Sequence, residues 1–169
     1  MRRLVINTER LVLKPINAES FNDFKNIVCD SSVSRYYMLP KFKDDSEVMR
    51  MHERFIKLTN NENIFFYGAY LSEELIGFIN QVDIAENRIE LGYVISPKHQ
   101  NKGYCTEILK ECINELFNLG YNTVRCGFFE QNTASKRVME KCNMQRISFE
   151  EDIEYNGNLY HCIYYDITK

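Results

Sequence analysis

The stretch that decides the fold is residues 100–107, which read Gln100-Asn101-Lys102-Gly103-Tyr104-Cys105-Thr106-Glu107. It follows the apolar run 91–95 and opens an amphipathic segment, so we predict a strand, a short loop and then a helix. The start of a helix leaves backbone N–H groups unpaired and carries a partial positive charge. The sequence therefore predicts a binding site for a phosphate or pyrophosphate at this loop.

The helix after this loop has the clearest pattern in the chain. Between positions 105 and 117 apolar residues recur at spacings of three and four, and Gly120 is a typical residue to end a helix. Before the loop, strand-like runs at 64–71, 75–82 and 88–95 are separated by short polar turns. Connections this short predict an antiparallel meander.

The C-terminal part continues the alternation of strands and helices. We predict a strand at 122–129, a helix at 132–142, and a hairpin of two strands at 147–155 and 159–167. The hairpin turns at Asn156-Gly157, which is a strong signal for a two-residue turn.

The N-terminal part begins with a strand at 10–15, which Pro15 ends. We predict a helix capped by Ser20 that runs to about 29, a loop at 34–40, and a helix capped by Asp45 or Ser46 that runs to about 58. The predicted order is β α α β β β α β α β β, in one domain spanning 1–169.

Composition and charge exclude several classes of function. The net charge of the 169 residues is −3, which argues against a nucleic-acid partner and against an anionic membrane surface. No run is long enough to span a bilayer, so no membrane association is expected. The six cysteines form no CxxC pair, so we expect no metal site and a cytoplasmic protein with reduced thiols. Locally, Lys98, Lys102 and Lys110 surround the predicted phosphate loop, and Glu107 opposes them.

The order of elements, with the phosphate loop after the third meander strand, resembles the GCN5-related N-acetyltransferase (GNAT) family. The pyrophosphate motif of that family, Q/R-x-x-G-x-G/A, appears here as Gln100-x-x-Gly103-x-Cys105, with cysteine as the last small residue. Segments 8–15, 90–95 and 132–144 resemble the branch that acetylates ribosomal-protein N-termini (RimJ/RimL-like). The resemblance covers about 8–168, with its motif core at about 64–145.

The resemblance implies an α/β (α+β) fold of the GNAT type, in which helices flank a central mixed, mostly antiparallel sheet. It implies acetyl-CoA as co-substrate, lying in a notch where two central parallel strands separate. The backbone of Tyr93, Val94 and Ile95 would pair with the pantetheine arm, and Asn132 and Ser135 would contact it. The residues whose backbone N–H groups would hold the pyrophosphate are Gln100, Asn101, Lys102, Gly103, Tyr104, Cys105 and Thr106.

The resemblance also suggests catalytic residues. Met139 stands where many members carry a tyrosine that acts as general acid, and a thioether cannot donate a proton. Ser135, one turn earlier, is the candidate replacement, or else it only orients CoA. Glu90 is the candidate base, acting directly or through water, with a solvated strand carboxylate as the alternative interpretation. Tyr36 and Tyr37 are candidates for the acceptor site, with a core or surface role as the alternative.

The expected reaction is direct attack of a neutral primary amine on the thioester. Deprotonating an α-amine at pH 7 costs about 1 kcal/mol, against about 5 kcal/mol for a lysine side chain. A protein or peptide N-terminus is the leading acceptor. The alternatives are a small amine (polyamine, amino acid or aminoglycoside), or a non-catalytic acyl-CoA-binding domain. Either a monomer or a homodimer fits the sequence.

Overall fold

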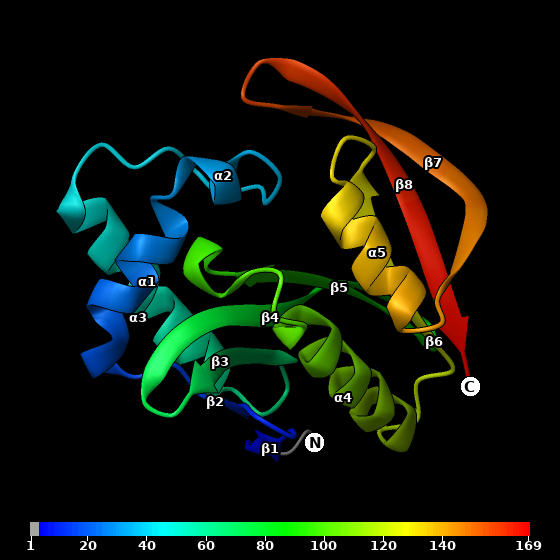
Figure 1. Cartoon of the computed structure of the whole chain (residues 1–169), viewed down its shortest axis with the longest axis horizontal. Coiled ribbons are helices and arrows are strands. Elements are labelled where there is room, and N and C mark those ends of the chain that lie inside the picture. The colour runs from blue at the N-terminus through cyan, green and yellow to red at the C-terminus, as the bar shows by residue number, and fades with distance from the viewer. Residues whose placement is uncertain (1–3) are drawn as a thin grey trace.

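The computed structural model describes residues 4–169 and is built around one eight-stranded sheet (Figure 1). In the order in which they lie side by side, its strands are β1 (Ile6–Asn7), β2 (Val12–Lys14), β3 (Phe66–Leu71), β4 (Glu74–Ala85), β5 (Arg88–Ile95), β6 (Thr123–Phe129), β8 (Asn158–Thr168) and β7 (Gln145–Tyr155).

The sheet is mixed at its centre. Every neighbouring pair in it is antiparallel except β5 and β6, which run parallel and pair from Arg88–Thr123 to Leu91–Cys126. The ladder between them ends there, although β5 continues to Ile95 and β6 to Phe129. The predicted mixed, mostly antiparallel sheet is confirmed, and its two central strands separate towards their carboxyl ends.

Helices cover both faces of the sheet. One core joins strand residues such as Leu91 and Cys126 to α4 (Tyr104–Asn118) and α5 (Thr133–Lys141). A second core joins residues such as Phe78 and Val94 to α1 (Phe21–Val28) and α3 (Asp45–Asn60). Because side chains alternate along a strand, these two cores lie on opposite faces.

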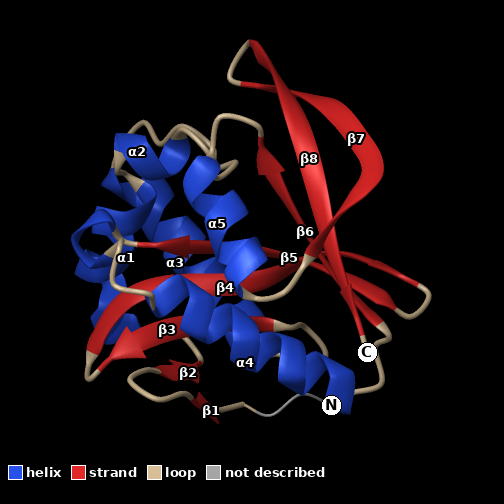
Figure 2. Cartoon of the chain, turned by 45° about the vertical axis from the view of Figure 1, so that its right-hand side comes forward, coloured by secondary structure: helices blue, strands red, loops and turns tan. Residues whose placement is uncertain are grey.

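Short helices complete the connections. They are η1 (Ala18–Ser20), α2 (Ser31–Ser34) and η2 (Pro97–His99). Figure 2 shows the helices gathered around β3–β5, while the β7–β8 hairpin stands out beyond them. Within residues 4–169, no helix combines the length and the apolar character needed to cross a bilayer.

The structure corrects several predicted boundaries. Asp44, not Asp45 or Ser46, caps α3, because its carboxylate accepts the N–H of Glu47 at 3.1 Å. Ser20 precedes α1 as predicted, yet its side chain does not cap the helix. Its hydroxyl instead donates to the carbonyl of Asn17 at 2.8 Å inside the protein.

The short helices η1, α2 and η2 and the strand β1 were not predicted. Asp30 caps the short helix α2 by accepting the N–H of Ser32, and this helix overlaps the start of the predicted 34–40 loop. The strand β1 is only two residues long and is held by pairing with β2, which no local pattern signals.

Candidate functional site

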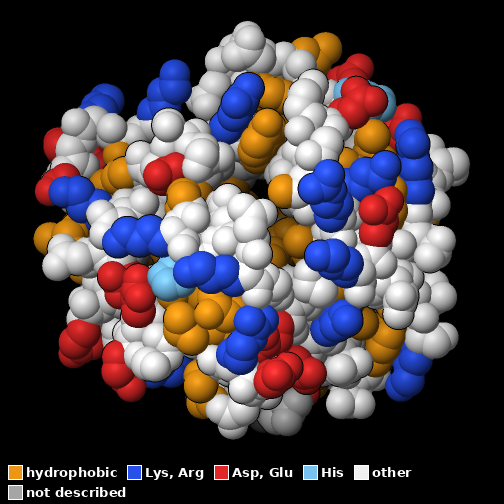
Figure 3. Space-filling model, in the orientation of Figure 1, with side chains coloured by type: hydrophobic (Ala, Val, Ile, Leu, Met, Phe, Trp, Pro, Cys, Tyr) orange, Lys and Arg blue, Asp and Glu red, His pale blue; other side chains and the backbone are white. Residues whose placement is uncertain are grey.

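A cavity of about 440 Å³ lies where β5 and β6 separate. Its wall includes Tyr93 and Ser135 from the side of α4 and α5, and Tyr37 and Val94 from the side of α1–α3. The cavity therefore extends through the sheet rather than lying on one face of it. Figure 3 shows a hollow on the face of α4 and α5, with Lys and Arg side chains around it and hydrophobic side chains within.

Two glycines occupy the point at which the strands part. Gly92 and Gly127 follow the last paired residues of β5 and β6, and both line the cavity. A Cβ atom on Gly127 would stand 2.6 Å from the ring of Tyr164, and one on Gly92 would stand 3.1 Å from Val82. Sequence reasoning missed both positions, because the side chains that crowd them come from other strands.

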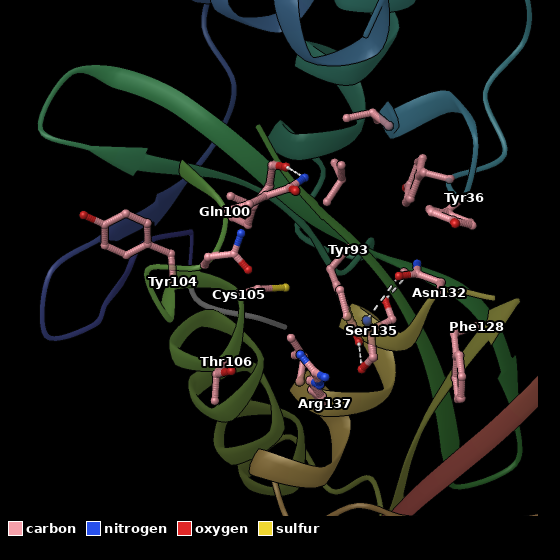
Figure 4. Close-up of a pocket in the computed structure, with 18 of the residues that line it drawn as sticks. Tyr36, Tyr93, Gln100, Tyr104, Cys105, Thr106, Phe128, Asn132, Ser135 and Arg137 are labelled. Atoms are coloured by element: carbon pink, nitrogen blue, oxygen red, sulfur yellow. Dashed lines mark hydrogen bonds between the residues drawn. The ribbon is translucent and has the colours of Figure 1, made fainter. Parts of the chain in front are cut away.

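The loop from Gln100 to Gly103 has the form of an anion site. Asn101 and Gly103 have positive φ angles of 61° and 82°, so the chain turns sharply before α4 begins. The Gln100 amide donates to the carbonyl of Ile95 at 3.0 Å, which ties the loop to the end of β5 (Figure 4). Among the side chains of residues 4–169, none caps α4. Its first N–H groups are thus left for a ligand, as an anion site requires.

An arginine that the sequence did not single out braces this loop. Arg10 donates to Glu107 at 2.7 Å and to the carbonyl of Lys102 at 3.0 Å, and its guanidinium lies 4.5 Å from the centre of the Tyr104 ring. Partial burial opposes ionisation of Glu107, but hydrogen bonds from Thr8 and Arg10 outweigh it and lower the pKa of Glu107. Glu107 was expected to oppose the lysines at the loop, yet its charge is neutralised by Arg10.

The cavity edge of β5 is open for pairing. Tyr93, Val94 and Ile95 pair with β4 along one edge of the strand, while their other edge faces the gap left by β6. All three line the cavity. Apart from the Ile95 carbonyl, which accepts the Gln100 amide, the N–H and C=O groups on that edge can pair with an extended ligand that adds to the sheet like a further strand.

The first turn of α5 carries the predicted pair Asn132 and Ser135. The Asn132 side chain accepts the N–H of Ser135 at 3.2 Å and donates to its hydroxyl at 3.3 Å. Tyr93 donates to the Ser135 carbonyl at 3.4 Å, so β5 also holds this turn (Figure 4). Met139 is completely buried in the core on this side of the sheet.

The cavity face of α5 is longer than predicted. Ala134, Arg137, Val138 and Lys141 also line the cavity. Their spacing of three, four and seven residues is the periodicity of one helix face, so the sequence did contain this signal.

Glu90 lies on the opposite face of the sheet from its neighbour Leu91, and it is not in the cavity wall. It stands in register with Arg125 on β6, whose guanidinium is held by Asp166 at 2.8 and 2.9 Å. Burial raises the pKa of Glu90 to about 7, although Arg125 acts in the opposite direction. The next residue on the same side of β5 is Gly92, in the cavity wall, so a carboxylate that titrates near neutrality stands beside the cavity.

Of the remaining candidates, Tyr36 and Tyr37 both line the cavity. The Tyr37 hydroxyl donates to the side chain of Asn80 at 2.5 Å, and burial raises the pKa of Tyr37. Lys102 is absent from the wall, and its carbonyl is turned to Arg10. The described part of the chain holds no cluster of His, Cys, Asp or Glu side chains that could ligate a metal.

The sequence matches the family model of the acetyltransferase (GNAT) domain over residues 10–145. The chain therefore belongs to the GNAT acetyltransferases and is an N-acetyltransferase. It is 27% identical to the uncharacterized N-acetyltransferase YoaA of Bacillus subtilis (strain 168), covering 98% of this chain and 97% of that protein.

Solved structures share the fold. RimL, a ribosomal L7/L12 alpha-N-protein acetyltransferase, superposes with a TM-score of 0.84 at 14% identity, covering 100% of this chain and 96% of RimL. The microcin C7 self-immunity acetyltransferase MccE, in complex with acetyl-CoA and AMP, gives a TM-score of 0.81 at 16% identity, covering 95% and 93%. These neighbours agree with the predicted fold.

Proposed function

We propose that the protein transfers the acetyl group of acetyl-CoA to a primary amine, with a protein or peptide N-terminal α-amine as the leading acceptor. The observation that carries this proposal is the cavity through the sheet. It has an anion site and a free strand edge on one side, and Tyr36, Tyr37 and the nearby Glu90 on the other. The acetyl-CoA complex of MccE and the α-N-protein substrate of RimL support the two halves of the reaction in proteins of the same fold.

The residues present fit acetyl-CoA. The N–H groups of the 100–106 loop would hold the pyrophosphate, and Arg137 and Lys141 add positive charge in the same wall. The open edge of β5 at residues 93–95 would pair with the amide-containing pantetheine arm, with Asn132 reaching it from α5. An N–H on this edge would stabilise the charge that develops on the thioester oxygen.

Proton transfer is assigned to two side chains. Glu90 accepts the proton of the amine through a water, because it stands beside the cavity rather than in its wall. Ser135 is the donor beside the leaving thiolate, since its hydroxyl is held at the cavity by Asn132. One domain spanning 1–169, acting in the reducing cytoplasm where its six cysteines stay free, is part of this proposal.

The reaction itself is tested by thiol release from acetyl-CoA against peptides with free N-termini, polyamines, amino acids and aminoglycosides, corrected for the six thiols of the protein. We expect the highest kcat/KM for a peptide α-amine, and none for the same peptide with a blocked N-terminus. Turnover on small amines alone would refute the acceptor assignment. Acetyl-CoA binding by calorimetry without turnover on any amine would favour a binding-only domain.

The pKa of Glu90 predicts how kcat/KM depends on pH. As the pH rises through about 7 Glu90 loses its proton and becomes a base, so kcat/KM of the wild type should rise there. Glu90→Gln should abolish this limb and lower kcat/KM by about 10²- to 10⁴-fold. Glu86→Gln, on the exposed β4–β5 turn, is the matched control and should keep the wild-type profile. An unchanged acid limb in Glu90→Gln would assign the base to another group.

The Ser135→Ala variant tests whether Ser135 donates a proton to the leaving thiolate or only helps to bind acetyl-CoA. If the hydroxyl serves the leaving thiolate, turnover should fall by about 100-fold while the affinity for acetyl-CoA changes little. Stopped-flow turnover and calorimetry on the same preparation measure the two effects. Equal losses in both would leave Ser135 with an orienting role only.

The Arg10→Ala variant should remove the hydrogen bonds that hold the phosphate loop in place. We expect acetyl-CoA to bind about tenfold more weakly, because charged hydrogen bonds to Glu107 and Lys102 are lost. Acetyl-pantetheine lacks the pyrophosphate, so its affinity should not change. Arg54→Ala on the exposed face of α3 is the control. Equal losses for both ligands would mean that Arg10 does not act through the loop.

A further inference from the structure

The segment 35–44 joins α2 to α3 without regular secondary structure, and it carries Tyr36 and Tyr37 into the cavity wall. The N–H groups of Tyr36 and Tyr37 donate to the carbonyl of Val33 at 3.1 and 2.9 Å, which continues the last turn of α2. Beyond that turn the segment lacks the hydrogen-bond ladder of a strand or helix, so contacts with other parts of the chain are needed to hold it. Those contacts, together with the turn at Val33, set the position of the two tyrosines.

A single hydroxyl from the far end of the chain supplies such contacts. Tyr155 is the last residue of β7, next to the hairpin turn, and its hydroxyl donates to the Ser34 carbonyl at 2.7 Å. The carbonyls of Leu39 and Tyr37 lie at 3.1 and 3.4 Å. The same oxygen accepts the N–H of Leu39 at 3.2 Å. One side chain thus reaches both ends of the segment 34–39, which contains Tyr36 and Tyr37.

The ring of Tyr155 is held independently of its hydroxyl. Its centre lies 6.3 Å from that of Phe129, at the end of β6, and 6.3 Å from that of Tyr160 on β8. Phe129 and Tyr160 stack with centres 4.5 Å apart, and Tyr36 packs against the same cluster. These contacts hold the ring of Tyr155 against β6 and β8, and its hydroxyl is left to contact the 34–39 segment.

Strand pairing also joins the hairpin to β6. β7 pairs with β8 up to Tyr155–Asn158, and β8 pairs with β6 up to Phe129–Cys162. β6 is one of the two strands that part to form the cavity. The side chain of Tyr155 therefore connects the loop with Tyr36 and Tyr37 to the strand on the other side of the cavity. Figure 1 shows the β7–β8 hairpin to which it belongs.

We propose that Tyr155 is a positioning residue for the acceptor: its hydroxyl holds the 34–39 segment so that Tyr36 and Tyr37 form one wall of the acceptor site. This inference rests on the proposed acetyl transfer. It assigns to the β7–β8 hairpin a role in acceptor affinity that leaves the binding of acetyl-CoA, on the other side of the sheet, untouched.

The test compares Tyr155→Phe with Tyr160→Phe. The first variant keeps the ring and removes the bridge, and the second removes a neighbouring hydroxyl that has no hydrogen-bond partner within residues 4–169. With the best acceptor of the wild type, Tyr155→Phe should raise the acceptor KM by about tenfold, as expected for the loss of two hydrogen bonds. The KM for acetyl-CoA should not change, and kcat should fall much less. Tyr160→Phe should match the wild type.

Amide hydrogen exchange of Leu39 gives a readout that does not depend on activity. Its N–H donates to Tyr155, so exchange should become faster in Tyr155→Phe and stay unchanged in Tyr160→Phe. Faster exchange with an unaltered acceptor KM would overturn the positioning role. Unaltered exchange would overturn the bridge itself. A wild type that turns over no amine while Leu39 exchange still responds would instead count against the proposed function.

Discussion

The site depends on the place at which the parallel ladder between β5 and β6 stops. The strands pair for four residue pairs and then separate, while both continue in extended form. A buried strand edge needs hydrogen-bond partners, so the open edge of β5 is a position for an extended ligand with amide groups. At this gap the sheet no longer separates its two faces. One cavity is therefore shared by two faces that the rest of the fold keeps apart.

The two faces differ in electrostatics, although the chain as a whole carries a net charge of only −3. On the side of α4 and α5, helix N-termini, Arg137 and Lys141 favour a polyanionic group, in agreement with the basic rim in Figure 3. On the other side, Arg125 is committed to Asp166, and Glu90 remains as a partly buried carboxylate. The two halves of the proposed reaction would thus have different electrostatic environments on the two sides of the gap.

Two long-range contacts stabilise two irregular segments that line the cavity. Arg10 and Glu107 join the N-terminal strands to the phosphate loop, and Tyr155 joins the C-terminal hairpin to the loop with Tyr36 and Tyr37. Both are side-chain bridges to backbone carbonyls, which otherwise have no ladder to hold them. The two ends of the chain therefore take part in the site, although the recognisable motifs lie in its middle.

The sequence alone determined most of the elements, the loop before α4 and the family, because periodicity, turn residues and helix starts are local properties. It also predicted the cavity residues that follow one strand or one helix, such as Tyr93–Ile95 and Asn132. The tertiary structure alone decided the pairing of Arg10 with Glu107, 97 residues away, and the bridge from Tyr155 to Ser34, 121 residues away. It also decided the need for Gly127 beneath Tyr164, and the pKa of Glu90 near 7. Each of these depends on burial or on contacts between distant segments, and the order of residues along the chain does not encode them locally.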